Sequence, residues 1–189
     1  MSLSSVFDPP LEEPLLLRLF FLISVCAWTL LQGCSPVLDW RDVRPADTRV
    51  QGLFPCKPQV QERRVQLAGE RVRLLLHACT AGGLTWALAH ADMADPVRVQ
   101  QALTELSASA AGNIGAAATE GTALQVPGST PNPASRRSRL QGALPDGQRV
   151  QMHLAVFVHG TTVFQATVLG DQVAEEPAQT FFSGLRFPS

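Results

Sequence analysis

The sequence has no tyrosine and one lysine, Lys57, among its 189 residues. Its 15 basic and 16 acidic residues leave a formal net charge of −1, so it lacks the basic excess with which proteins bind nucleic acid. The only tight basic group, Arg136, Arg137 and Arg139, lies in the stretch VPGSTPNPASRRSRLQG. Because proline, serine and glycine are frequent there, the stretch predicts a solvated loop. We therefore expect no nucleic-acid partner.

Catalytic signatures are also missing. The chain has no G-x-S-x-G nucleophile elbow, so VFVHGTT (156–162) does not fit the oxyanion turn of an α/β-hydrolase, and Gly160 is expected to be a hairpin turn. The glycines of GNIGAAATEG (112–121) lack the G-x-G-x-x-G spacing and follow a predicted helix, whereas a nucleotide loop precedes one. The acidic residues form no pair set for general acid–base catalysis. We expect no enzymatic activity, no catalytic residue and no cofactor.

Potential metal ligands are sparse. His90, Asp92 and Met93 lie together in LAHADMAD, and histidine with methionine would suit copper. On a strand, however, Met93 points away from His90, and no second histidine is near in the sequence. His77 and His153 lie in predicted strands opposite a hydrophobic face, where we expect them to be exposed or hydrogen-bonded. The sequence predicts no metal site.

The longest apolar run, LFFLISVCAWTLL, extends from Leu19 to Leu31 and follows Arg18. As a helix, these 13 residues would span about 20 Å. The hydrocarbon core of a bilayer is about 30 Å thick, so the run is short for a transmembrane span. It is typical of the hydrophobic region of a signal peptide.

The run ends at Leu31-Gln32-Gly33-Cys34, which resembles the lipobox of bacterial lipoproteins. The resemblance implies that the Cys34 thiol receives a diacylglycerol and that a peptidase cuts before this residue. Two or three acyl chains anchor a protein firmly, at about 0.8 kcal/mol per buried methylene. Ser35 is not the aspartate that retains many lipoproteins in the inner membrane. The resemblance therefore implies the outer membrane, facing the periplasm, with the inner membrane as the alternative.

The N-terminal segment departs from this pattern, because Asp8, Glu12 and Glu13 outnumber its single arginine where a signal peptide should be basic. Either translation starts nearer Leu15, or the acidic extension is tolerated. A further alternative is an uncleaved membrane anchor with an unrelated cysteine. We expect three parts, namely a signal peptide at 1–33, a lipidated tether at 34–37 and a periplasmic α+β domain at 38–189.

The four cysteines have different expected fates. Cys26 lies in the leader and would be removed, and Cys34 would be lipidated. Cys56 and Cys79 remain as an even pair in an oxidising compartment, which predicts a disulfide. Two unpaired thiols are the alternative. A metal site is disfavoured, because the chain has no C-x-x-C motif.

The segment after Cys34 predicts an antiparallel sheet with helices. Turn residues and alternating apolar residues predict strands at 50–58, 62–78 (a hairpin around Gly69), 84–92 and 149–171 (a long hairpin). Apolar stripes at helical spacing predict helices at 95–117, capped by Asp95, and at 174–187. A connector rich in proline and serine, 127–138, separates the two groups. The expected fold is α+β, with two main helices packed on an antiparallel sheet.

This order of elements resembles the PsbP-like fold, named for an extrinsic subunit of photosystem II. The resemblance rests on Leu53-Phe54-Pro55, Val163-Phe164-Gln165-Ala166 and Phe181-Phe182-Ser183-Gly184-Leu185, and it covers about residues 38–187. Ser183-Gly184-Leu185 departs slightly from the phenylalanine-rich ending of the family. Members are mostly non-catalytic: they stabilise complexes, assist assembly or bind partners, and the resemblance implies a similar role here.

The sequence thus predicts a membrane-anchored periplasmic lipoprotein that acts as a non-catalytic accessory or assembly factor for an envelope complex. Its expected partners are the membrane, through the lipid anchor, and an envelope protein. The alternative is a periplasmic binding protein for a small apolar ligand or lipid. In that case we expect the ligand to lie between the sheet and the helix at 95–115.

Overall fold

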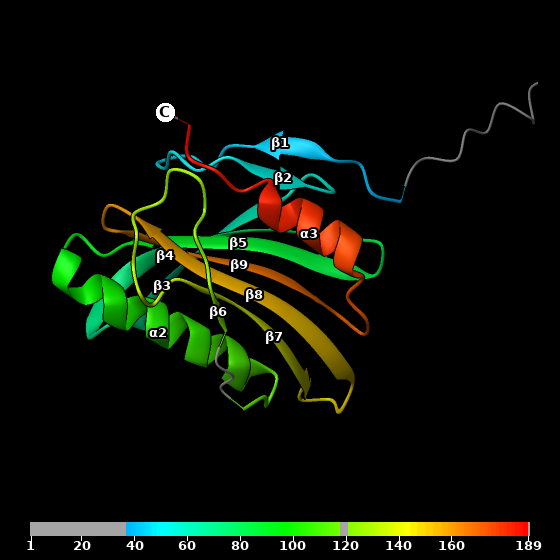
Figure 1. Cartoon of the computed structure of the whole chain (residues 1–189). Coiled ribbons are helices and arrows are strands. Elements are labelled where there is room, and N and C mark those ends of the chain that lie inside the picture. Colours follow the sequence, from blue (N-terminus) through cyan, green and yellow to red (C-terminus); the bar gives the residue numbers. More distant parts are fainter. Residues whose placement is uncertain (1–36, 118–120, 189) are drawn as a thin grey trace, which may run out of the picture. The chain divides into compact units, whose positions relative to one another are not determined.

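A computed structural model of the chain describes residues 37–117 and 121–188 (Figure 1). The predicted signal peptide, the predicted lipidation residue Cys34 and most of the predicted tether lie outside the described residues. Within the described ranges, no helix is both long enough and apolar enough to cross a membrane.

Seven strands form one sheet in the spatial order β3-β4-β5-β9-β8-β7-β6, and all neighbouring strands pair antiparallel. Their bounds are Gln59–Leu67 (β3), Glu70–Ala81 (β4), Leu84–Asp92 (β5), Thr122–Ala123 (β6), Arg136–Ala143 (β7), Arg149–His159 (β8) and Thr162–Gly170 (β9). Two short strands, β1 (Arg41–Val43) and β2 (Gly52–Phe54), pair separately. With the helices α2 (Pro96–Asn113) and α3 (Glu175–Ser183), these strands make the predicted α+β fold.

Helix α2 carries the chain from β5, in the middle of the sheet, to β6 at its far edge. The Asp95 carboxylate caps the helix by accepting a hydrogen bond of 2.9 Å from the Val97 N–H, and Pro96 occupies the first turn. The predicted apolar stripe is buried, with its members Val99, Leu103, Leu106, Ala110 and Ile114. The crossover therefore lays α2 along one face of the sheet (Figure 1).

Both faces of the sheet are buried at its centre, along β5, β9 and β8. Helix α2 covers one face, and α3 with the β1–β2 sheet covers the other (Figure 1). Seven consecutive residues of β8, 152–158, are buried for this reason. On the second face, the ring centroid of Phe181 in α3 lies 5.5 Å from that of Trp86 and 5.2 Å from that of Phe54. Burial of each such side chain contributes about 1.5–3 kcal/mol.

The prediction of a solvated loop around Arg136 was wrong, because this segment forms β7. The Arg137 guanidinium lies 4.3 Å from the ring centroid of Phe182. The Arg139 Nη2 lies 2.5 Å from the Glu175 Oε1. A guanidinium that lies over an aromatic ring or pairs with a carboxylate lets a basic strand pack under a helix. Arg137 and Arg139 are therefore tied to α3.

Candidate binding site between α2 and the sheet

A partly enclosed cavity of about 290 Å³ lies between α2 and strands β7 and β8. We call it the α2 groove. Its apolar lining consists of Leu103, Ala108, Ala111, Ala134, Leu140 and Leu154. Ligand pockets commonly measure roughly 300–1,000 Å³, so the groove is at the lower end of that range. It lies in the place where the alternative prediction put a small apolar ligand.

The groove combines an apolar interior with polar groups nearer solvent. Leu103, Leu140 and Leu154 are buried, whereas Thr104 is exposed and Arg136 is half-buried. The Arg136 Nη2 donates one long hydrogen bond, of 3.4 Å, to the carbonyl of the neighbouring loop. No carboxylate in the described part of the chain pairs with it. The arrangement suits an apolar molecule with an acidic group, since both parts would find a complementary surface.

Small side chains keep the groove open. Helix α2 presents Ser107, Ala108 and Ala111 to it. At its C-terminal end the helix approaches β7 closely, because the Ala143 N–H donates to the carbonyl that follows the helix, that of Ile114, at 2.8 Å. A Cβ on residue 142 would collide with that carbonyl, so the close approach requires Gly142. The C-terminal end of the helix is thus held near the sheet. The groove lies beside Ser107, Ala108 and Ala111, whose side chains are too small to fill it.

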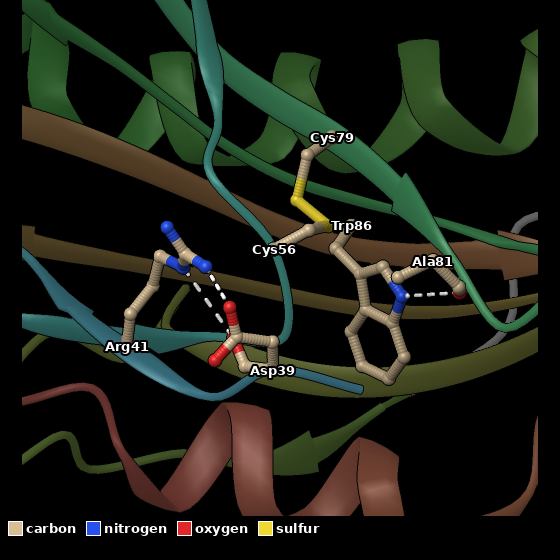
Figure 2. The surroundings of a disulfide bond; sticks show 6 residues. All are labelled: Asp39, Arg41, Cys56, Cys79, Ala81 and Trp86. Atoms are coloured by element: carbon tan, nitrogen blue, oxygen red, sulfur yellow. Dashed lines mark hydrogen bonds and ion pairs between the residues drawn. A yellow bond between two sulfur atoms is a disulfide. The ribbon is translucent and has the colours of Figure 1, made fainter. Parts of the chain in front are cut away.

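The predicted disulfide between Cys56 and Cys79 is present (Figure 2). It joins the segment after β2 to β4, with Cα atoms 6.1 Å apart. Beside it, the Trp86 Nε1 donates to the Ala81 carbonyl at 3.1 Å. The Trp40 ring packs edge-on against Trp86, with 5.9 Å between centroids. The disulfide therefore fastens the small β1–β2 sheet to the large sheet beside a fully buried tryptophan.

The expectation that His77 and His153 could be exposed was wrong. Both are buried, with 6% and 5% of their surface exposed. Within the described residues, the His77 Nε2 and the His153 Nδ1 have no hydrogen-bond partner. The reason is the second covering layer, which buries the sheet face that the strand pattern had left to solvent. Burial lowers the pKa of both imidazoles, so both are neutral near pH 7.

The fold brings His90 beside His77. The register of β4 and β5 pairs His77 with Leu88 and Leu75 with His90, which makes the two histidines diagonal neighbours on one face. Their rings are nearly parallel, with centroids 5.5 Å apart. Burial, followed by the neighbouring His77, lowers the pKa of His90 to about 4. The sequence pattern showed each strand but not the register that creates this pair.

Asp92 and Met93 have structural roles. The Asp92 Oδ1 accepts hydrogen bonds from the Thr161 hydroxyl at 2.7 Å and from the Ala94 N–H at 2.9 Å. These bonds, that of Thr161 first, lower the pKa of Asp92. Met93 packs in the core under α2, whereas His90 lies on the opposite face of the sheet. The prediction that Met93 points away from His90 is confirmed.

The segment VFVHGTT forms the end of β8 and the turn into β9. Gly160 has a φ of 61°, a conformation that favours glycine. Its N–H donates to the Thr130 hydroxyl at 2.8 Å. The predicted hairpin turn is confirmed.

No protein-family model, curated protein or solved structure matches the chain. The resemblances to bacterial lipoproteins and to the PsbP-like fold therefore stay predictions.

Proposed function

We propose that the chain is a membrane-anchored periplasmic lipoprotein that acts without catalysis, as an accessory or assembly factor for an envelope complex. The disulfide between Cys56 and Cys79 supports a location outside the cytoplasm, because such bonds persist in oxidising compartments and are rare in reducing ones. The lipobox-like sequence ending at Cys34 supplies the anchor. The absence of aspartate after it favours the outer membrane.

The open edge of the sheet supports a function in which the protein binds a partner protein. Strand β3 ends the sheet, spans nine residues and, among the described residues, pairs with β4 alone. An edge strand of this length presents unpaired N–H and C=O groups, to which a partner can add a strand. Glu62, Arg63 and Arg64 along this edge discourage pairing with a second copy and favour a partner of complementary charge.

Site-specific crosslinking tests this role. A photoreactive residue at Val60, on β3 and 57% exposed, should capture one defined envelope complex in living cells. The matched control is Val97, at the start of α2 and 84% exposed, which should capture nothing specific. Recovery of monomer alone from Val60, or the same products from both positions, would contradict a partner that docks on β3.

The α2 groove favours a second function, the binding of a small apolar ligand or lipid. Its volume of about 290 Å³ and its apolar lining suit part of an acyl chain. The half-buried Arg136, which has no carboxylate partner in the described ranges, suits an acidic head group.

Lipid extraction tests this second function. The full-length protein purified from cells should yield a fatty acid or similar amphiphile that is not covalently attached. Ala108→Leu places a larger side chain in the groove and should abolish its recovery. The control Ser109→Leu introduces leucine at the next position of the helix, which is exposed and outside the groove, and should leave recovery unchanged. Equal recovery from both variants would exclude the groove as the binding site.

A further inference from the structure

Another cavity, of about 570 Å³, lies between β4 and the connection from β1 to β2, and we call it the β4 cavity. It has no part in either proposed function. Its charged lining consists of four cations and two carboxylates, namely Arg41, Arg44, Lys57 and Arg73 with Asp42 and Asp47. The cavity therefore has a net positive charge, which attracts an anion.

Both carboxylates of the lining already have a cationic partner. The Asp42 Oδ1 lies 3.5 Å from the Arg186 Nη2, and the Asp47 Oδ2 lies 3.7 Å from the Arg73 Nη1. The Arg73 Nε lies 3.0 Å from the Glu62 Oε2. Because these side chains offset one another, the surplus positive charge belongs to the remaining cations.

Two of those cations are unpaired. Arg41 is paired with Asp39, as Figure 2 shows. By contrast, neither the Arg44 nor the Lys57 side chain makes a hydrogen bond or an ion pair with any described residue, and both are exposed. Hydrogen bonds from cationic groups to an anion are about twice as strong as neutral ones. One anion in the β4 cavity could accept them from both side chains.

The backbone of both cations is restricted before any anion binds. Each precedes a proline, Pro45 or Pro58, which confines the residue before it to an extended conformation. Lys57 also follows Cys56, whose disulfide with Cys79 joins this segment to β4. Binding therefore costs less conformational entropy than it would on a flexible loop.

The rest of the lining indicates what kind of anion fits. A phosphate group has enough oxygen atoms to bind both cations, and the planar guanidinium of arginine matches its geometry. The lining also has an apolar part, formed by Val43, Val60 and Leu75. A phosphate ester has both parts, since a carbon chain is attached to its phosphate.

We propose that the β4 cavity binds a phosphate ester, with Arg44 and Lys57 bound to the phosphate oxygens and the apolar lining in contact with the adjoining carbon chain. The ester is either an anionic phospholipid of the membrane or a soluble molecule. The membrane source rests on the proposed lipid anchor. Arg44 is ten residues after Cys34, so the anchor would keep it within about 36 Å of the lipidated residue. Basic residues beside a membrane favour anionic lipids.

The reactivity of Lys57 tests the proposal, because it is the only lysine of the chain. In the full-length protein in detergent, saturating glycerol 3-phosphate should slow the acetylation of its amine, as measured by mass spectrometry of the peptide that contains it. Arg44→Gln should raise the concentration needed for protection by about tenfold or more. The matched control is Arg149→Gln, which replaces another exposed arginine outside the cavity and should leave protection unchanged.

Lipid nanodiscs distinguish the two sources. Protection in nanodiscs of phosphatidylglycerol, but neither in those of phosphatidylcholine nor with glycerol 3-phosphate, would assign the cavity to a membrane lipid. Protection by glycerol 3-phosphate would assign it to a soluble ester. In either case Arg44→Gln should weaken the protection.

The proposal would be overturned if neither glycerol 3-phosphate nor phosphatidylglycerol protected Lys57. Equal protection in the unaltered protein and in Arg44→Gln would also overturn it, because the anion would then act without the cavity. The measurement with glycerol 3-phosphate does not require the lipid anchor. Its failure is therefore distinct from a missing palmitate label at Cys34, which would contradict the anchor instead.

Discussion

Replacement of both Cys56 and Cys79 by alanine is expected to destabilise the domain substantially. In the folded protein their bond joins the segment after β2 to β4 and closes a loop between positions 23 apart in the sequence. Without the bond, the unfolded chain gains the conformations that the crosslink forbids, while the folded state keeps its two sheets and both helices.

The size of the effect follows from the loop. For 23 residues, the chain-entropy relation gives about 3.4 kcal/mol near room temperature. Domains of ordinary size are stable by roughly 5–15 kcal/mol, so the crosslink would supply a large share of the total. The contacts of Trp40 with Trp86 and of Phe54 with Phe181 remain to hold the β1–β2 sheet in place. We therefore expect the variant to fold, with a lower free energy of unfolding.

Urea unfolding followed by tryptophan fluorescence measures this difference, since Trp40 and Trp86 pack together beside the disulfide. The midpoint should fall in the double alanine variant, and the unaltered protein should show the same midpoint after reduction with dithiothreitol. Agreement between the two identifies loss of the crosslink, rather than loss of the cysteine side chains, as the cause. An unchanged midpoint in both experiments would show that Cys56 and Cys79 are not bonded in the native protein.

Acid and two glycine substitutions should also change the stability of the protein. Because the folded-state pKa of His90 is lowered from 6.5 to about 4, the unfolded chain takes up a proton that the folded chain does not. This proton alone should lower the free energy of unfolding by about 3 kcal/mol as the pH drops from about 6.5 to about 4, and His90→Leu should remove that contribution in urea titrations. Gly142→Ala should lower the melting temperature, because its Cβ would collide with the Ile114 carbonyl. Gly112→Ala, in α2 with open space around it, should instead stabilise the protein by about 0.5–1 kcal/mol.

Helix α2 and the disulfide were predictable from the sequence. The stripe of α2 repeats at helical spacing, and Asp95 with Pro96 marks its start, so the helix was placed within a few residues. The disulfide was predictable because the predicted removal of the leader and the predicted lipidation of Cys34 would leave two cysteines. The helix follows from a local pattern of apolar residues, and the disulfide follows from the number of cysteines.

Strand β7 was missed because its residues resemble those of a loop. Its sequence RRSRLQGA has three arginines and little alternation of apolar residues. It pairs as a strand because α2 covers one of its faces and α3 receives the guanidinium groups of Arg137 and Arg139 on the other. Those partners lie about 40 residues further along the chain, beyond the reach of a periodicity argument.

The α2 groove and the pair of His77 and His90 could not be predicted either. The α2 groove depends on how far small residues such as Ala108 and Ala111 stand from β7, which packing decides. The pair of His77 and His90 depends on the register of β4 with β5, since a shift by one residue would place one histidine on the opposite face.

The mass of the N-terminal peptide shows whether the protein carries a lipid anchor. Purified protein from cells grown with labelled palmitate should be labelled and should begin at Cys34, with the mass of two or three acyl chains added to its N-terminal peptide. Cys34→Ala should abolish the label and release or mislocalise the protein, whereas Cys26→Ala should change neither. A labelled Cys34→Ala protein, or an unmodified peptide that still contains the residues before Cys34, would contradict the lipid anchor.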